Sequence, residues 1–470
     1  SVSAEKTASL VVFQPMILLV AFLGGLLLQF VTLKAPANIY DEGLVLHNAS
    51  RILSGEVPYR DFWTLYAPGY FYVLSGLFKM FGETILIARV FDVLVRFLVT
   101  VAVYWFARRM VSWWAALIPY AFTSLWLASI RFYVYPAFPA LWAIFLALIL
   151  FARYLETGRQ RWLFFAGLAL GLTATLRLDF GGYAAIGSGL ALVVHEGWVV
   201  RKGAWKFGPA LLAVLRAVLI LAGGMGVVAL GLFGPLAIAS GPAVLWEDLI
   251  HFPATTFRAM RHLPLPPLLP DLLGFNRSAW EEWLRLYVPI SVFMVGLAAA
   301  VGLVWRERSR AGGQRDRLAV LFIALSITGF GLVIKATSRY HDLHALPAAF
   351  LAVVTAVALF SRVPARAWRS LAFLVVFGLF LLSAILDPYV LHFTGLFGEV
   401  SQYRWNGCYS TLERAACIPV SPEQQAAVEF IRASTMPDDY IFVANFRHDQ
   451  IIVNDNVFYF LAGRRSPTSY

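Results

Sequence analysis

Two adjacent carboxylates, Asp41 and Glu42, follow the first long apolar run of the 470-residue chain. A carboxylate held there can act as a general base, because a lipid-borne and a water-borne substrate meet at the membrane surface. The structural alternative is that Asp41 caps the helix that follows by accepting hydrogen bonds from backbone N–H groups. The residue types alone leave both interpretations open.

A second group of candidate residues runs from Lys335 to His344. Arg339 offers a planar fork of donors and Lys335 a compact charge, so these two cations could hold a phosphate. Anchoring of the chain at the membrane interface is the alternative use of such residues. His341 and His344 lie beside Asp342, but two histidines three residues apart are a weak set of metal ligands. We therefore leave the metal unknown and the need for a divalent cation open.

Charges at the ends of apolar runs, or within them, form a third group. Arg177 and Asp179 are either paired with each other or functional, because an isolated charge at this depth is costly. As functional residues, Asp179 would be a catalytic carboxylate and Arg177 a ligand of phosphate. Arg131 stands at the end of another apolar run and is a further candidate for phosphate binding. We expect Asp92 and Arg96, four residues apart, to form a structural ion pair.

The composition of the whole chain is that of a membrane protein. The chain is 60% hydrophobic and 14% charged, against roughly 45–50% and 25% in soluble globular proteins. Too few polar side chains remain to cover a single core, which excludes a soluble enzyme, a disordered chain and a coiled coil. The apolar runs are also far longer than the roughly 10-residue strands of membrane barrels. Basic loops that set orientation account for the net charge of +11, so we expect no nucleic-acid partner.

Runs of about 20 apolar residues predict eleven membrane-spanning helices. These start near Leu10, Ile87, Trp113, Phe138, Trp162, Gly182, Leu211, Leu286, Leu318, His344 and Leu371. The positive-inside rule places the short basic loops in the cytoplasm, so the N-terminus is inside and the C-terminus outside. The long segments 34–86, 240–285 and 388–470 then lie on the outer, periplasmic face of a plasma or inner membrane.

We therefore predict a mainly α fold: a polytopic bundle over residues 1–387 and a small outer α/β domain over 388–470. Within that domain, Pro422–Ala433 predicts a helix, Tyr440–Ala444 a buried strand and Val457–Ala462 a short apolar element. We expect the domain to be truncated at Tyr470.

The first outer loop carries a recognisable pattern. A short amphipathic helix is expected from Glu42 to Leu53, and it should lie in the plane of the membrane interface. The motifs Gly55-Glu-Val-Pro-Tyr-Arg-Asp-Phe and Tyr66-Ala-Pro-Gly-Tyr follow. Together with the Asp–Glu pair, this loop resembles that of GT-C superfamily glycosyltransferases. It is most similar to the bacterial relatives of protein O-mannosyltransferase and of the lipid A aminoarabinose transferase.

The resemblance implies an inverting hexosyl or pentosyl transferase in the cell envelope. Its donor would be a sugar on a polyprenyl-phosphate carrier, and its acceptor a lipid, glycan or protein on the outer face. The family's acidic motif implies that Asp41 is catalytic and that Glu42 supports it. By the same resemblance, the segment around Lys335 and Arg339 binds the donor phosphate. The predicted substrate groove includes Tyr59, Arg60, Asp61, Tyr66, Tyr340 and His341.

Several family members place a second acidic residue after the third span, and Arg131 stands there instead. This departure weakens any two-carboxylate or metal-dependent scheme taken from relatives. Asp41 would then work with Asp179 or alone.

The only two cysteines, Cys408 and Cys417, both fall in the outer tail. In an oxidising compartment such a pair predicts a disulfide, with two reduced thiols as the alternative.

A transporter or flippase of lipid-linked saccharides is the alternative function. The concentration of charges in outer segments favours a transferase, because a flippase would carry charges through its spans. A degenerate family member that serves as a binding subunit is disfavoured by the presence of Asp41.

Overall fold

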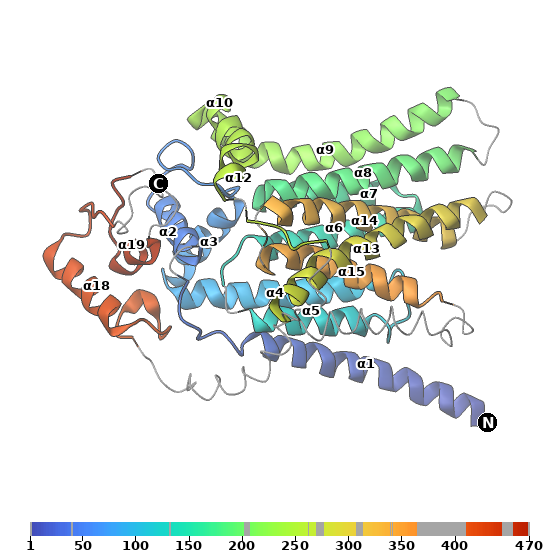
Figure 1. The fold of residues 1–470 in the computed structure, drawn as a ribbon, viewed down its shortest axis with the longest axis horizontal. Coiled ribbons are helices and arrows are strands. Elements are labelled where there is room, and N and C mark those ends of the chain that lie inside the picture. Colours follow the sequence, from blue (N-terminus) through green and yellow to red (C-terminus); the bar gives the residue numbers. More distant parts are fainter. Residues whose placement is uncertain are drawn as a thin grey trace.

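The computed structural model is a bundle of long helices with shorter helices gathered at one end (Figure 1). It describes residues 2–38, 41–130, 133–201, 207–261, 263–268, 277–306, 314–338, 340, 342–363, 410–443 and 455–468. The long helices are α1 (Val2–Gln29), α4 (Ile85–Ala107), α5 (Leu117–Ser129), α6 (Ala137–Thr157), α7 (Gln160–Leu176), α8 (Leu178–Arg201), α9 (Phe207–Ser240), α13 (Arg277–Arg306), α14 (Gln314–Ser338) and α15 (Asp342–Phe360). These ten helices match the first ten predicted spans in order, and the run at Leu371 lies outside the described residues.

Among the described residues, six helices are long and apolar enough to cross a membrane. They are Ala137–Thr157, Leu178–Gly197, Gly208–Ser240, Glu282–Trp305, Asp316–Ser338 and Leu343–Phe360. Gln14–Gln29 and Leu117–Ser129 are shorter apolar helices. The chain is therefore a multi-pass membrane protein, and a total of eleven spans stays a prediction.

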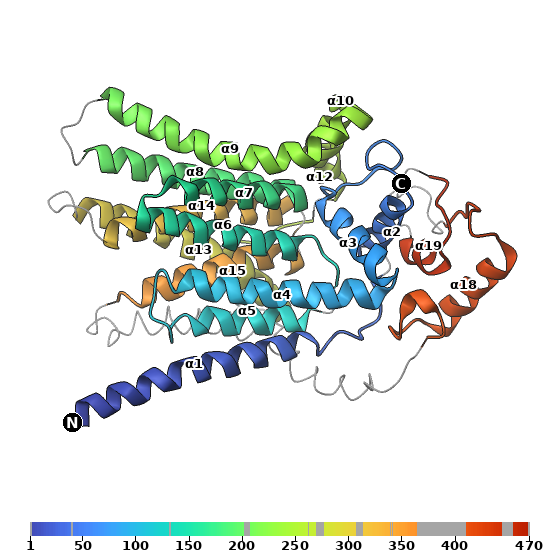
Figure 2. The same cartoon turned by 180° about the vertical axis from the view of Figure 1, so that it is seen from behind.

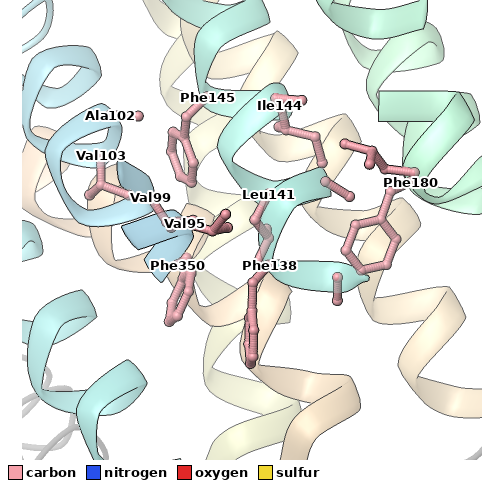
Figure 3. Packing of buried hydrophobic residues seen from close by; sticks show 14 of the residues in the cluster. Val95, Val99, Ala102, Val103, Phe138, Leu141, Ile144, Phe145, Phe180 and Phe350 are labelled. Carbon is pink, nitrogen blue, oxygen red and sulfur yellow. The ribbon is translucent and has the colours of Figure 1, made fainter. Parts of the chain in front are cut away.

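Interlocking apolar side chains from helices far apart in sequence hold the bundle together (Figure 3). Val95 and Val99 of α4, Phe138 and Phe145 of α6, and Phe350 of α15 are all buried in one cluster. The α6 helix packs against α4 and α7, and α14 packs against α8, α13 and α15. These contacts fix the ends of the helices relative to one another, and the candidate residues lie at those ends.

Short helices from the three segments that are predicted to lie outside meet at one end of the bundle (Figures 1 and 2). They are α2 (Asp41–Leu53), α3 (Gly69–Phe81), α10 (Pro242–Trp246), a π-helical turn (Glu247–His251), α11 (Phe252–Ala254), α12 (Thr256–Arg261), a 3₁₀ turn (Glu413–Ala415), α18 (Pro422–Ser434) and α19 (Asn456–Ala462). The first two outer segments touch directly, since the rings of Trp63 and Phe252 are 5.5 Å apart.

The amphipathic helix predicted in the first outer loop is present as α2, and its apolar face packs against protein. Its position relative to the membrane interface stays a prediction. Residues of the tail cover it: α19 packs against α2, and a Cβ at Gly43 would lie 2.7 Å from the Val457 backbone nitrogen. The His47 ring stacks on Tyr459 with centroids 4.9 Å apart. Burial lowers the pKa of His47 to about 3, so the ring is neutral at ordinary pH.

The regular elements of the described tail are helices joined by irregular segments. The helix predicted from Pro422 is α18, capped by the Ser421 hydroxyl. The predicted strand at Tyr440 is reduced to an isolated bridge with Arg465. No other partner strand lies within residues 410–443 and 455–468, so the expected α/β character is absent from these ranges. Cys417 is disulfide-bonded and Cys408 lies outside the described residues, so their pairing stays a prediction.

Asp455 makes the docking of α19 sensitive to pH. Its carboxylate accepts a hydrogen bond from the Val457 N–H at 3.1 Å, and burial raises its pKa to about 6. The folded-state pKa exceeds the unfolded value of about 3.9, so the folded protein binds this proton more tightly. We expect this stabilisation to be complete below about pH 4 and lost as pH rises through 6. Thermal unfolding of Asp455→Asn across this range should lack that component, and an unchanged profile would contradict the assignment.

The orientation of the bundle gives a second test. The start of α1 lies at the end of the bundle away from α18 and α19 (Figures 1 and 2). A cysteine introduced at Ser54, exposed beside α2, is expected to react with an impermeant thiol reagent from outside. A cysteine at Ser112, exposed at the opposite end, should react only after permeabilisation. The reverse pattern would overturn the predicted topology, and the chain without added cysteines gives the background.

Candidate active site

Asp41 is the first residue of α2, at the end of the bundle where the outer segments meet (Figure 1). Its backbone N–H donates to Oδ1 of Asn38 at 3.0 Å, and its own Oδ1 accepts a hydrogen bond from the Tyr66 hydroxyl at 3.1 Å. Within the described part of the chain, Oδ2 of Asp41 accepts no hydrogen bond. No cap by Asp41 is formed among these residues, so the capping alternative is not supported there.

Tyr66 is a neutral hydrogen-bond donor that holds the Asp41 carboxylate in place. Burial, together with the nearby Asp41 charge, raises the pKa of Tyr66 well above its usual range. The Tyr59 hydroxyl donates to the Tyr66 carbonyl at 2.9 Å, which holds the backbone of this residue. Tyr66 therefore stays protonated at any working pH and orients Asp41 without competing for its proton.

Arg177 and Asp179 pair with each other, which is one of the two alternatives that the sequence left open. The Arg177 Nε and Nη2 atoms donate to the two Asp179 oxygens at 3.0 and 2.6 Å. The guanidinium carbon also lies 5.2 Å from the Tyr66 ring centroid. A charge held over an aromatic ring in this way is attracted by the electrons of the ring. The ion pair is therefore part of the Asp41 site, and Asp179 orients Arg177.

A close approach between α3 and α7 brings these groups together. A Cβ on Gly69 would lie 2.5 Å from the carbonyl oxygen of Thr175, so only glycine fits at the start of α3. This contact fixes the first outer loop, which carries Tyr66, against the residues that precede Arg177. The motif Tyr66-Ala-Pro-Gly-Tyr thus has a packing function as well as a chemical one.

Lys335 completes the cluster from the last turn of α14. Its ammonium group is a hydrogen-bond partner of the His344 Nδ1 atom and lies within electrostatic range of Arg177, Asp179 and Asp41. The structure therefore places Lys335, from the candidate segment Lys335–His344, near Asp41. Arg339, His341 and Arg131 lie outside the described residues, and their functions stay predictions.

The other described residues of the predicted groove bond elsewhere. Arg60 and Asp61 form an ion pair with each other at 2.7 Å, and Asp61 Oδ2 accepts the Val57 N–H in the same turn. The Tyr340 hydroxyl donates to the Glu282 carbonyl at 2.6 Å. Within the described residues, neither Arg60 nor Asp61 contacts Asp41. Of this predicted set, the structure brings Tyr66 to Asp41, with Tyr59 behind it.

Glu42 pairs with a buried arginine and not with the Asp41 group. Its side chain is fully buried, and its two oxygens accept hydrogen bonds from Arg89 Nε and Nη2 at 2.7 and 2.8 Å. This geometry favours a supporting function over the catalytic one. Arg89 was missed in the sequence, although an arginine inside an apolar helix is costly enough to mark a partner. The predicted pair Asp92–Arg96 is confirmed at 2.8 Å in the same helix.

The Arg89 guanidinium also binds the end of the first span. Its Nη1 atom donates to the carbonyls of Leu33 and Ala35, and Nη2 donates to Pro36. One buried cation thus ties the segment before Asp41 to the helix that Asp41 begins.

We predict that Arg89→Gln destabilises the protein strongly. Removing one partner of a buried ion pair costs about 3–5 kcal/mol, because the other charge is left uncompensated. The matched control is Arg60→Gln, whose exposed pair contributes little to stability because solvent screens it. Thermal unfolding of the detergent-purified proteins should show a large fall in midpoint for the first variant alone. Equal midpoints for the two variants would show that the Arg89 network does not hold the loop.

The ranges that the structure describes contain no set of protein ligands for a metal ion. No group of three or more His, Cys, Asp and Glu side chains there is placed to hold one. A divalent cation bound with the donor phosphate stays untested.

Comparison with known proteins adds a fold assignment. No family model and no curated protein matches the sequence. Among solved structures, ArnT from Cupriavidus metallidurans bound to undecaprenyl phosphate is similar, with a TM-score of 0.54 and 15% identity over 96% of this chain and 85% of ArnT. The apo state of the same protein gives a TM-score of 0.50 and 15% identity over 98% and 86% of the two chains.

The oligosaccharyltransferase of Archaeoglobus fulgidus, tethered with an acceptor peptide, is also similar. The TM-score is 0.50 at 14% identity, over 96% of this chain and 64% of the archaeal protein. The chain thus spans less than two thirds of that enzyme's length. Both similar proteins are GT-C glycosyltransferases. The chain therefore has the fold of the GT-C superfamily of membrane glycosyltransferases, which the first outer loop predicted.

Proposed function

We propose that the chain is an inverting glycosyltransferase that moves a sugar from a polyprenyl-phosphate carrier to an acceptor on the outer face of the membrane. The observation that carries the proposal is the position of Asp41. It begins α2 with one oxygen held by Tyr66, beside the Arg177–Asp179 pair and Lys335. The GT-C fold supports the same activity, since the ArnT structure holds undecaprenyl phosphate.

In the proposed reaction, Asp41 takes the proton of an acceptor hydroxyl as its oxygen attacks the anomeric carbon. The bond between that carbon and the carrier's phosphate oxygen breaks, and its electron pair leaves with the polyprenyl phosphate. Attack opposite to the leaving group inverts the anomeric carbon. Lys335, with Arg339 and Arg131, would stabilise the charge on the released phosphate. Arg177, which Asp179 holds in place, would be a further ligand of that phosphate.

The acceptor is a lipid, glycan or protein, and the donor sugar is a hexose or pentose. In this proposal residues 388–470 belong to the outer face, where α19 covers the loop that carries Asp41. Glu42 supports the loop through Arg89 and does not touch the substrate.

A transfer assay with purified protein tests the proposal. The protein in mixed micelles is incubated with radiolabelled polyprenyl-phosphate sugars and with total lipid, glycan or peptide acceptors. We expect the label to leave the carrier and to enter one acceptor class in a protein-dependent manner. Recovery of intact donor with every sugar and acceptor tested, from protein that still binds the donor, would contradict transferase activity.

A further inference from the structure

A hollow lies at the end of the bundle away from Asp41. It has a volume of about 720 Å³ and is lined by the turn after α4, the start of α14 and the segment after α15. Its polar lining consists of Arg108, Arg109, Ser112, Ser361 and Arg362. These residues come from positions some 250 apart in sequence, so the bundle assembles the hollow and no single loop could form it.

Two of the three guanidinium groups of this hollow, those of Arg108 and Arg362, are held by backbone carbonyls. Arg362 Nη2 donates to the Met110 carbonyl at 2.7 Å and so joins two walls of the hollow. Arg108 Nη1 donates to the Val111 carbonyl at 3.1 Å within its own turn. Fixed guanidinium groups lose little side-chain entropy when they bind a ligand, which favours recognition of an anion.

The charge of the hollow is only partly balanced. Arg109 forms an ion pair with Glu156, with nitrogen–oxygen distances of 2.8 and 2.9 Å. Arg108 and Arg362 pair with no carboxylate in the part of the chain that the structure describes. Two fixed positive charges with exposed serine residues beside them suit a phosphate group, which accepts several charge-assisted hydrogen bonds.

Apolar residues at the rim indicate where the ligand comes from. Trp114 lines the hollow and is 62% exposed, and Ile118 one turn further along is 40% exposed. Exposed tryptophan at the end of a membrane bundle is typical of headgroup depth. A lipid can therefore place its phosphate in the hollow while its acyl chains follow the apolar helix surface.

We propose that this hollow, the Arg108–Arg362 pocket, binds the phosphate of an anionic glycerophospholipid at the membrane face opposite the Asp41 site. Basic pockets between membrane helices bind anionic headgroups by the same physics. The site is independent of the proposed sugar transfer, because it requires no group of the Asp41 cluster.

Binding of labelled phosphatidylglycerol to the full-length protein in mixed micelles tests the proposal, with phosphatidylcholine as the uncharged comparison. The pocket variant Arg108→Gln/Arg362→Gln should lose about tenfold or more in affinity for phosphatidylglycerol. The control Arg159→Gln/Arg161→Gln removes two exposed charges at the junction of α6 and α7, outside the pocket, and should stay within about threefold of wild type. Equal losses in both variants would show only a diffuse basic surface, and no loss in either would overturn the site.

Two further measurements complete the experiment. Inorganic phosphate should not displace the lipid at matched concentration, and efficient displacement would mean that the pocket takes a free anion. If the double variant does not fold, Arg108→Gln alone is measured, because its backbone bond lies within a single turn. Wild-type affinity in that folded variant would contradict the proposal.

Discussion

Replacing Asp41 with asparagine is expected to lower sugar transfer by about 10²–10⁴-fold, the usual contribution of a general base. Asparagine keeps the size of the side chain and can still accept the Tyr66 hydrogen bond, but it cannot take a proton. Donor binding should survive, because Asp41 is assigned to the acceptor and not to the phosphate. Turnover and donor affinity of the purified variant give the two readouts.

The neighbouring carboxylate provides the control. Glu42→Gln should lower the unfolding midpoint, since it leaves Arg89 buried without its charge partner. The protein that remains folded should lose less turnover than Asp41→Asn. The opposite ranking would move the base to Glu42. If neither substitution lowers turnover tenfold, the acceptor is activated elsewhere in the cluster, with Asp179 as the next carboxylate.

Removing the Lys335 charge should produce the second large effect. We expect Lys335→Ala to lower turnover by about 10²–10³-fold, the size of effect seen when a charge-stabilising group is removed from a transition state. The loss should fall mainly on the turnover number, because the charge of the phosphate grows as the sugar leaves. Steady-state kinetics with a polyprenyl-phosphate sugar separate this number from the Michaelis constant.

Lys79→Ala is the matched control for this experiment. Lys79 is an exposed lysine in the last turn of α3, near the same end of the bundle, and its loss should leave turnover unchanged. Wild-type kinetics in Lys335→Ala would show that the lysine only anchors α14 at the membrane interface. A parallel Arg339→Lys variant examines the other predicted cation, whose bidentate fork lysine cannot replace.

The helices and the position of the site could be predicted from local sequence, because each depends on patterns within about 20 residues. The apolar runs gave ten of the long helices, and the period from Glu42 to Leu53 gave α2 almost to the residue. The Asp–Glu pair marked the candidate site because it follows the first apolar run, and in the structure both residues begin α2. The pair Arg177–Asp179 was found, although only the structure shows that it lies against Tyr66.

Contacts between segments far apart in sequence could not be predicted in this way. The burial of α2 depends on α19, more than 400 residues later, so its own amphipathic pattern could not indicate this contact. Lys335 meets Arg177 and Asp179 only because α14 packs against α8. Arg89 was visible as a charge in an apolar helix, but its partner could be identified only from the fold. The strand expected at Tyr440 had no extended partner within the described tail.

The central claim is that Asp41 promotes transfer of a sugar away from a phosphate carrier, and a doubly labelled donor tests it most directly. A polyprenyl-phosphate sugar carries tritium in the sugar and ³²P in the phosphate, and is mixed with purified protein and acceptor in a single turnover. Wild-type protein should move the tritium to the acceptor and leave an equal amount of ³²P in polyprenyl phosphate, whereas Asp41→Asn should bind the donor and release neither. Tritium and ³²P that stay together in both proteins, with donor only moved across a vesicle membrane, would contradict the account and identify a flippase.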